Sequence, residues 1–416
     1  MYGPYNSVMF TNIDVREIMK DILLITNYWH FECEKASSRY YTLANMIVES
    51  GHRLEIITST FYHATKKHRQ YEERFLNSFP YKITMVHEPG YAKNISIKRL
   101  ISHKIFAENV LKYIKNRKKP DVIYCVIPSL DVANLVAKYA NRNNIKLIID
   151  IQDLWPEAFR MAFDIPIISD LLFYPLKIKA NNAYKAADEI VAVSDTYVER
   201  ALTVNKKCEK GHSVYLGIEL SKFDVFASKT NQIEKPSDEI WLAYIGALGH
   251  SYDLITVIDA LKILRDQGIR NIKFVVMGDG PLKTIFKNHA ETQNVNVEFT
   301  GFLNYEKMVS ILARCDIAVN PIIKNSVASI INKVADYAAA GLPVLNTQES
   351  AEYRKIIKNE VIGFNCENGN PYDLADKLKI LCKNEKLRKK MGMNNRRLAE
   401  RKFDRHKTYF QILELL

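Results

Sequence analysis

Short runs of apolar and β-branched residues alternate along the chain with longer stretches in which apolar positions recur at helical spacing. In the first half, the strand-like runs are residues 21–26, 53–58, 82–87, 121–126, 146–150 and 189–193. In the second half they are 240–245, 272–277, 295–300, 316–320 and 343–346. The main helical stretches are 36–50, 254–267, 281–292, 305–314, 330–340 and 371–382. Because alternating strands and helices are typical of parallel sheets with helices on their faces, the pattern predicts an α/β chain with two doubly wound, Rossmann-like domains.

A polar, aperiodic segment at residues 221–237 separates the two series and is predicted to be a linker. It divides a first domain, 19–220, from a second domain, 238–392. Residues 1–18 show neither periodicity nor turn patterns and are expected to form a loosely ordered extension. Residues 393–416 are predicted to be a helix that returns to the first domain. The cleft between the two domains is the expected ligand site.

The composition is that of an ordinary globular protein, with 47% hydrophobic and 25% charged residues. The sequence has neither an apolar run of about 18 residues nor a secretory leader, so we expect a cytoplasmic protein. The six cysteines are scattered without a CxxC pair, which predicts free thiols and no structural zinc.

The formal net charge of +12 favours an anionic partner. Residues 91–119 hold nine basic side chains and one acidic side chain, Glu108, on an amphipathic helical pattern. Two interpretations stay open. The segment is either a solvated basic face of a core helix or a contact with an anionic membrane, which would make the protein peripheral. A nucleic-acid partner is not expected, because no nucleic-acid-binding motif is present.

Four segments of the second domain place glycine or polar residues just after a predicted strand, where parallel sheets bind anionic ligands. They are residues 244–250, 276–281, 299–302 and 316–343. None completes a G-x-G-x-x-G pattern with an acidic residue about 20 positions further on, so a nicotinamide enzyme is disfavoured.

Four motifs in order resemble the retaining glycosyltransferases of family 4, which have the GT-B fold, and most closely those of bacterial capsule and O-antigen loci. They are DIQDLWPE at 150–157, IGALG at 245–249, GDGPL at 278–282 and NKVADYAAAGLPV at 332–344. The resemblance covers nearly all of the chain after Met19 and implies two Rossmann-like domains facing across a cleft.

The resemblance also implies a donor site. The family usually has two glutamates eight positions apart, the first near the donor sugar and the second bonding the ribose hydroxyls. Here the second position is Asp336 and the first is Ala328, which removes the usual sugar contact. Nearby polar residues that can substitute for it are Asn325, Ser326 and Ser329.

Lys333 matches a lysine of the family. The resemblance implies that this lysine and the N-terminus of its helix together bind the donor diphosphate. The family's more general arginine and lysine fall at Ala247 and Tyr252, so Lys333 must do more of this work, with Lys283 beside it. The other donor-site residues implied are Gly246, Gly249, Gly278, Asn332 and Phe302, the last lying against the base.

On the first-domain side, Ser37 and Arg39 match an A-S-x-R step in which the arginine clamps an anion or caps a helix. Asp153 takes the position nearest the reacting sugar, with a local capping role beside Pro156 as its alternative. Asp150 and Trp155 complete the acceptor and phosphate side.

The implied reaction transfers a sugar from a nucleoside-diphosphate donor, expected to be UDP-linked, to a hydroxyl of a lipid-linked or other glycan acceptor, with retention. Lys333 and Asp153 are the expected catalytic residues, and neither a cofactor nor a metal is expected. The alternatives are an epimerase or hydrolase of sugar nucleotides on the same fold, or a catalytically weak relative that only binds them.

Overall fold

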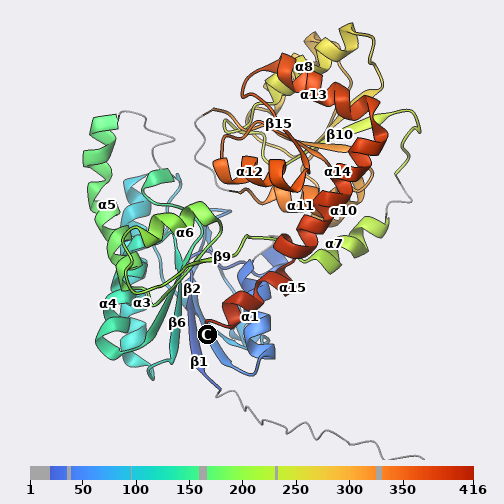
Figure 1. Cartoon of the computed structure of the whole chain (residues 1–416). Helices are drawn as coiled ribbons and strands as arrows, with labels where there is room; N and C mark the ends of the chain where they lie inside the picture. Colours follow the sequence, from blue (N-terminus) through green and yellow to red (C-terminus); the bar gives the residue numbers. More distant parts are fainter. Residues whose placement is uncertain (1–18, 35–38, 95, 159–165, 230–232, 325–329) are drawn as a thin grey trace, which may run out of the picture.

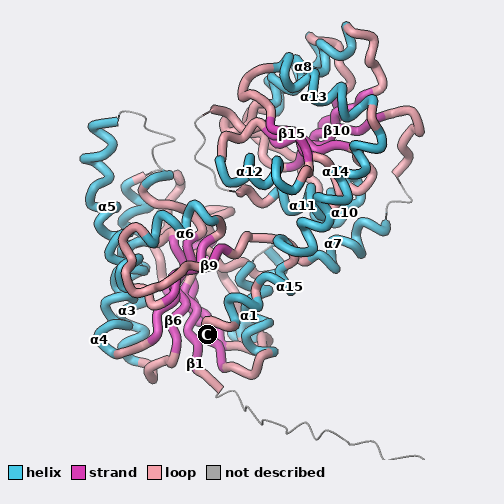
Figure 2. The backbone as a smooth tube through the Cα atoms, viewed as in Figure 1, coloured by secondary structure: helices cyan, strands magenta, loops and turns pink. Residues whose placement is uncertain are grey.

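The computed structural model describes residues 19–34, 39–94, 96–158, 166–229, 233–324 and 330–416. The expectations for residues 1–18, Ser37 and Ala328, and for the polar residues next to Ala328, therefore lie outside the described residues. The described chain forms two α/β bodies, each with a central sheet and helices on both faces (Figures 1 and 2). The two-domain prediction is confirmed.

A seven-stranded parallel sheet with the order β5-β2-β1-β6-β7-β8-β9 forms the first domain. Its strands are β1 (Asp21–Ile25), β2 (Arg53–Ser59), β5 (Lys82–Val86), β6 (Val122–Ile127), β7 (Lys146–Ile151), β8 (Glu189–Ala192) and β9 (His212–Ser213). A small antiparallel hairpin, β3 (Phe61–Tyr62) and β4 (Lys67–His68), follows β2. The helices are α1 (Arg39–Glu49), α2 (Glu73–Leu76), α3 (Ile97–Asn116), α4 (Leu130–Asn143), α5 (Pro166–Ala186) and α6 (Asp195–Leu202), with a 3-10 turn at Glu32–Glu34.

Alternate residues of each strand supply the cores on the two faces of this sheet. In β1, Leu23 and Ile25 pack in the core that contains Phe106 of α3, whereas Ile22 and Leu24 pack in the core that contains Leu43 of α1. Because helices cover both faces of the sheet, successive side chains of each strand are buried, and the strand sequences are nearly continuous apolar runs.

A six-stranded parallel sheet with the order β12-β11-β10-β13-β14-β15 forms the second domain. Its strands are β10 (Ile240–Ile245), β11 (Ile272–Met277), β12 (Val297–Gly301), β13 (Ile317–Asn320), β14 (Val344–Asn346) and β15 (Gly363–Asn365). Its helices are α7 (Leu220–Ala227), α8 (Leu254–Asp266), α9 (Lys283–Thr292), α10 (Tyr305–Leu312), α11 (Lys333–Ala339), α12 (Ala351–Glu360), α13 (Pro371–Lys383) and α14 (Glu385–Leu398).

Side-chain caps fix where several helices begin. Ser96 accepts from the Arg99 backbone at the start of α3, and Ser194 accepts from the Tyr197 backbone at the start of α6. At α13, Asn370 caps the first turn and Pro371 occupies the first position, where a missing N–H costs nothing.

In each sheet the order of the strands reverses next to the first strand of that domain, which is β1 in the first sheet and β10 in the second. In the second sheet β10 lies between β11 and β13, so the loops after β10 and β13 diverge to opposite faces. Such a switch point opens a crevice at the carboxyl ends of the strands, and Gly246 and Lys333 follow these two strands.

The predicted linker requires a correction. Residues 220–227 form α7, and Phe223 is 1% exposed in the core cluster that also contains Trp241 of β10. The segment therefore belongs to the second domain. The chain crosses earlier, because Val214 packs in a first-domain core while Tyr215 and Ile218 pack in the second-domain core.

The chain crosses back after α14. A π-helical turn, Ala399–Phe403, still packs on the second domain, and α15 (Arg405–Thr408) and α16 (Phe410–Leu413) follow. Tyr409 and Ile412 lie in the first-domain core with Leu43 of α1, which confirms the predicted return to the first domain (Figure 1). The two crossings are joined, because the Ile218 N–H donates to Phe403 O at 2.7 Å and the Arg405 N–H donates to Ile218 O at 2.9 Å.

Helix α3 does not present one uniform amphipathic face. Phe106, Val110 and Ile114 are buried, whereas Ile97 and Ile101 in the first turns are 76% and 52% exposed. No helix within the described ranges combines the length and the apolar composition that crossing a bilayer requires.

Candidate active site between the two domains

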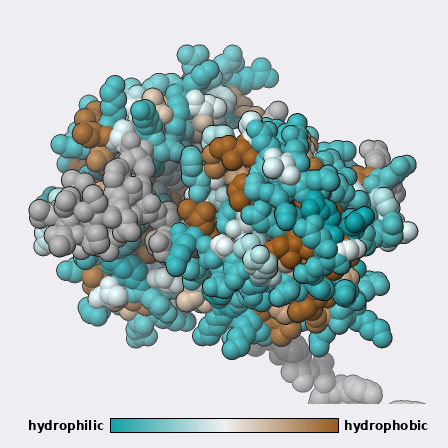
Figure 3. Space-filling model, turned by 90° about the horizontal axis from the view of Figure 1, so that it is seen from above, coloured by the Kyte–Doolittle hydropathy of each residue, from teal (hydrophilic) through white to brown (hydrophobic). Residues whose placement is uncertain are grey.

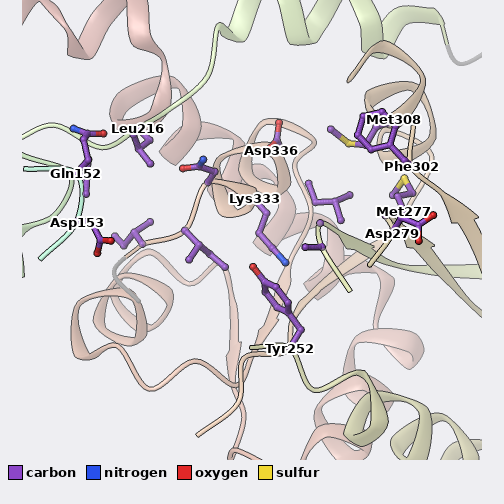
Figure 4. Close-up of a pocket in the computed structure, with 18 of the residues that line it drawn as sticks. Gln152, Asp153, Leu216, Tyr252, Met277, Asp279, Phe302, Met308, Lys333 and Asp336 are labelled. Atoms are coloured by element: carbon purple, nitrogen blue, oxygen red, sulfur yellow. The ribbon is translucent and has the colours of Figure 1, made fainter. Parts of the chain in front are cut away.

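A cavity of about 770 Å³ lies between the carboxyl ends of the two sheets. Figure 4 shows Gln152 and Asp153 on one side of it and Met277, Asp279, Phe302 and Met308 on the other, with Lys333 between them. The first domain lines it with Gln152, Asp153, Ala158, Val193, Tyr197 and Leu216. A volume of this size suits a ligand as large as a nucleotide sugar.

Lys333 is the charged group at the centre of the cavity. Its Nζ lies 4.0 Å from the ring centroid of Tyr244 and 3.9 Å from that of Tyr252. Figure 4 shows the Lys333 side chain extending towards Tyr252. The Nζ is buried and has no hydrogen-bond partner in the described part of the chain. Burial holds the pKa of Lys333 well below its ordinary value. An anion entering the cavity would supply the missing partner and favour the protonated amine.

Asp336 lies one helical turn further along α11 and also lines the cavity. The Tyr305 hydroxyl donates to Asp336 Oδ1 at 2.8 Å. Burial raises the pKa of Asp336 to about 6, although the Tyr305 hydrogen bond and the charge of Arg405 oppose the shift. At neutral pH the side chain is largely a carboxylate with acceptor capacity left for ligand hydroxyls.

Glycines shape the wall opposite Lys333. Gly246 has a φ of +129°, and a Cβ there would lie 2.9 Å from Lys333 Nζ. A Cβ on Gly278 would lie 1.8 Å from the Gly246 carbonyl oxygen, so this approach of the two loops requires glycine at position 278. Gly249, in contrast, has open space around it and does not line the cavity.

Phe302 and Asn332 both line the cavity, and Phe302 is 77% exposed. An exposed aromatic ring at this position is available for stacking, so Phe302 does not serve to fill the core. Lys283 lies outside the lining and donates to Asp279 Oδ2 at 3.0 Å, while Asp279 faces the cavity.

Asp153 is the first-domain carboxylate in the lining. The Trp155 indole N–H donates to Asp153 Oδ2 at 3.2 Å. Burial raises the pKa of Asp153. Trp155 itself is buried outside the lining, where its ring stacks on His103 at 5.7 Å between centroids.

Two cations, Lys66 and Arg99, and the imidazole of His63 form a cluster next to Trp155. The Arg99 guanidinium lies 4.4 Å over the Trp155 ring and donates to the Tyr28 hydroxyl at 2.8 Å. Lys66 Nζ lies 3.0 Å from His63 Nδ1. Burial, together with the charges of Lys66 and Arg99, lowers the pKa of His63 to about 4. These residues do not line the cavity, and the charges of Lys66 and Arg99 make the region around Trp155 positive.

Arg39 and Asp150 do not belong to the cleft, and this corrects their assignment to the acceptor side. Arg39 Nη2 pairs with Asp150 Oδ2 at 3.6 Å, and both side chains are almost fully buried. Tyr124 donates to Asp150 at 2.7 Å, and the ring of Tyr409 lies under the Arg39 guanidinium at 5.1 Å. Because the C-terminal segment covers this pair, it stabilises the interior of the first domain and is closed to ligands.

The sequence pattern did not single out the two tyrosines that enclose Lys333. Tyr252 stands where the family usually has a lysine, and Tyr244 is an inward residue of β10. One indication of this arrangement is present in the sequence, because the lysine that the family usually has at this position is replaced here by Tyr252.

Two parallel, Rossmann-like sheets that face each other across a ligand-sized cavity define the GT-B class of proteins. Two family models match the chain: "Glycosyltransferase Family 4" over residues 36–222 and "Glycosyl transferases group 1" over residues 226–398. Together they span both domains, and the chain belongs to the family 4 glycosyltransferases.

Relatives and solved structures agree with this assignment. The capsular polysaccharide biosynthesis glycosyltransferase CapM of Staphylococcus aureus is 22% identical over 322 residues, which cover 74% of this chain and 80% of CapM. The structure of HepE from Anabaena in complex with UDP-glucose has a TM-score of 0.64 at 15% identity, covering 95% of this chain and 98% of HepE. WaaG, a glycosyltransferase involved in lipopolysaccharide biosynthesis, has the same score, identity and coverage. The chain is thus a glycosyltransferase with the GT-B fold.

Proposed function

We propose that this glycosyltransferase takes a UDP-linked sugar as donor and transfers the sugar with retention to a hydroxyl of a lipid-linked glycan. The observation that carries the proposal is the buried Nζ of Lys333, which has no hydrogen-bond partner among the described residues and lies in an interdomain cavity that Asp336 also lines. A buried amine without an anion is costly, and a diphosphate supplies the anion.

The second domain would hold the nucleotide. Asp336 accepts from the ribose hydroxyls, Phe302 lies against the base, and the bare backbone at Gly246 and Gly278 lets the diphosphate approach Lys333. HepE, which shares the fold, has been solved with UDP-glucose, and this supports a uridine nucleotide as the donor.

The chemistry proposed for this chain is electrostatic. As the bond between the sugar and the diphosphate breaks, negative charge grows on the leaving oxygen, and the Lys333 ammonium stabilises it in a site with little water. The same oxygen accepts the proton of the attacking hydroxyl, so no protein nucleophile is required. Asp153, across the cavity, orients the sugar or the acceptor hydroxyl.

A peripheral contact with an anionic membrane fits the start of α3. Ile97, Leu100 and Ile101 share one helix face and are exposed, and Lys98 and Lys104 flank them. Because Arg99 of the same turns contacts Trp155, this surface lies next to the cleft. On the face seen from above, hydrophilic side chains cover most of the surface and hydrophobic ones form small patches (Figure 3), so attachment would combine charge with a few inserted side chains.

The test of the membrane contact is sedimentation with phosphatidylglycerol vesicles. We expect the I97S/I101S double variant to bind severalfold less than the parent protein. The matched control, I285S on α9, removes an exposed isoleucine that lies on the second domain. Equal sedimentation of all three proteins would remove the membrane contact from the proposal.

The test of the reaction is a panel of UDP-, GDP- and dTDP-sugars incubated with the protein and lipid-linked acceptors. Transfer from a UDP-sugar should fall at least a hundredfold in Lys333→Ala and tenfold or more in Asp336→Ala. Lys287→Ala, an exposed lysine of α9, is the matched control and should be unchanged. Equal transfer by all variants would refute the donor site.

The same panel separates the alternatives. Donor turnover without an acceptor would identify an epimerase or hydrolase. Nucleotide binding without any transfer would identify a binding relative. The proposal requires transfer that depends on the acceptor, with the product in the same anomeric configuration as the donor.

A further inference from the structure

A second recess, of about 440 Å³, lies in the first domain between α3, α4 and the loop after α3. Its lining consists of Leu111, Lys115, Arg117, Lys119, Leu135, Lys138, Tyr139, Arg142 and Asn143. Five of these nine side chains are basic and none is acidic. This recess does not share any residue with the donor cavity.

Most of this positive charge is not compensated. Arg117 is held by Asp21 and Glu55, with N–O distances of 3.0 Å to each. Its Nη1 is nevertheless buried without a hydrogen-bond partner among the described residues. The other four cations make neither an ion pair nor a hydrogen bond with any described residue: Lys115, Lys119, Lys138 and Arg142. All four are exposed to solvent, which screens their mutual repulsion, and their combined positive potential attracts an anion to this concave surface.

The recess lies at the end of the first domain away from the cleft. Arg117 pairs with Asp21 at the start of β1, whereas the donor cavity is at the carboxyl ends of the strands. Helix α3 has 20 residues and spans about 30 Å, with the exposed Ile97 at one end and Lys115 at the other. The two basic ends of this helix therefore have different surroundings, and the second end lines the recess.

We propose that this recess is a binding site for a compound that carries two or more phosphate groups. A single phosphate would leave most of the four free cations uncompensated. The Arg142 guanidinium can bind phosphate oxygens through two N–H groups, and the lysines act as mobile point charges. Leu111, Leu135 and Tyr139 give the recess an apolar wall, which a ring or short chain attached to the phosphates would contact. The compound is either soluble or the headgroup of an anionic lipid.

The test measures binding of inorganic diphosphate by calorimetry in the presence of saturating UDP, which occupies the donor cavity. We expect binding to weaken at least tenfold in the K138Q/R142Q double variant. The matched control is K112Q/K118Q, which removes the same charge from exposed lysines nearby that do not line the recess. The control should bind within about twofold of the parent protein.

A parallel arm uses cardiolipin vesicles, because the cardiolipin headgroup carries two phosphates, with phosphatidylcholine vesicles as the comparison of zero net charge. Loss of diphosphate binding in K138Q/R142Q alone supports a soluble ligand. Loss of vesicle binding in that variant, with no diphosphate binding in the parent, supports a lipid headgroup. If K138Q/R142Q and K112Q/K118Q behave alike with both probes, the site does not exist.

Stability supplies a separate readout. Because the free cations repel one another, K138Q/R142Q should unfold at the same or a higher temperature than the parent protein without ligand. With saturating UDP in the donor cavity, added diphosphate should raise the unfolding temperature of the parent and the control but not of this variant. A rise of equal size in all three proteins would overturn the proposal.

Discussion

Lys333 is unusual because it is a buried amine enclosed by aromatic rings rather than by carboxylates. Tyr244 and Tyr252 face its Nζ at about 4 Å, and their electron-rich faces partly compensate for lost hydration. Rings do not neutralise the charge, so the amine keeps its capacity to bind an anion. The arrangement depends on the empty space that Gly246 leaves beside Nζ.

The replacement of Gly246 by alanine tests that dependence. The new methyl would lie 2.9 Å from Lys333 Nζ, at a φ of +129° that alanine rarely adopts. We expect UDP affinity, measured by calorimetry, to fall about tenfold, which corresponds to ~1.4 kcal/mol. Gly249→Ala is the control, because nothing lies within 4 Å of its Cβ position. Equal affinities in the two variants would contradict the role of Gly246.

Asp336 predicts a conflict between stability and binding. Its pKa is raised from 3.8 to about 6, so the folded protein binds the proton more tightly than the unfolded chain. Folding stability from this group is therefore present at low pH and is lost as pH rises from about 4 to 6, a cost of about 3 kcal/mol above that range.

Asp336→Asn should remove this cost. We expect the variant to unfold at a higher temperature than the parent at pH 7.5 and to bind UDP more weakly there. Both differences should be smaller at pH 4.5, where Asp336 is largely protonated in the parent. A variant that is less stable at pH 7.5 would show that the carboxylate is compensated in the folded state.

Sequence alone predicted Lys333 and Asp336 because both follow a strand at the edge where parallel sheets bind ligands, within a motif of known order. Arg39 and Asp150 were assigned to the cleft by the same kind of matching, and the assignment was wrong. Their burial depends on Tyr409, which is more than 250 residues away in sequence, and local pattern does not report such a contact. The tyrosines around Lys333 were missed for the same reason.

Contact between the domains involves one helix terminus. Glu352 of α12 accepts from the backbone N–H groups of Asp195 and Thr196 at 3.0 and 3.1 Å, at the start of α6 in the first domain. It also accepts from the Tyr215 hydroxyl at 3.0 Å. A carboxylate at a helix N-terminus is favourable, so this contact stabilises the closed arrangement of the domains.

Removing that carboxylate should open the cleft. We expect Glu352→Ala to increase the radius of gyration measured by small-angle X-ray scattering, because charge-assisted hydrogen bonds contribute about 1.5–3 kcal/mol each. Glu360→Ala is the control on the same helix, since Glu360 bonds Arg401 of the C-terminal segment rather than the first domain. An unchanged radius in Glu352→Ala would show that other contacts keep the domains together.

At the level of elements, the strands were predicted well. No predicted strand ends more than two residues from the observed one, because β-branched apolar runs between helices leave few alternatives. Helix α7 was not predicted, since only Leu220 and Phe223 among its residues are buried and such a short apolar face gives little periodicity. Its helical state depends on packing against the second domain.

The whole molecule is joined through two adjacent crossings, at residues 214–218 and 403–405. Gly217 lies between them with a φ of +57°, and a Cβ there would lie 2.4 Å from the Phe403 carbonyl oxygen. The crossings are hydrogen-bonded to each other at Ile218, so a displacement of one is transmitted to the other.

Gly217→Ala should therefore lower the free energy of unfolding by more than the conformational cost of placing alanine at this positive φ. Left-handed backbone costs an alanine about 1–2 kcal/mol, and the contact with Phe403 adds to it. Gly51→Ala isolates the first contribution, because Gly51 has a φ of +84° and open space around it. Thermal unfolding should show a larger decrease for Gly217→Ala, and equal decreases would mean that the crossing has room to adjust.

Binding of the donor diphosphate by Lys333 is tested most directly by calorimetric titration of UDP into the parent protein, Lys333→Met and the control Lys287→Met. Methionine approximates the length of the lysine side chain and removes the charge. We predict that Lys333→Met binds UDP at least tenfold more weakly, while Lys287→Met binds like the parent. A Lys333→Met variant that is folded and binds UDP with the parent's affinity would contradict the account.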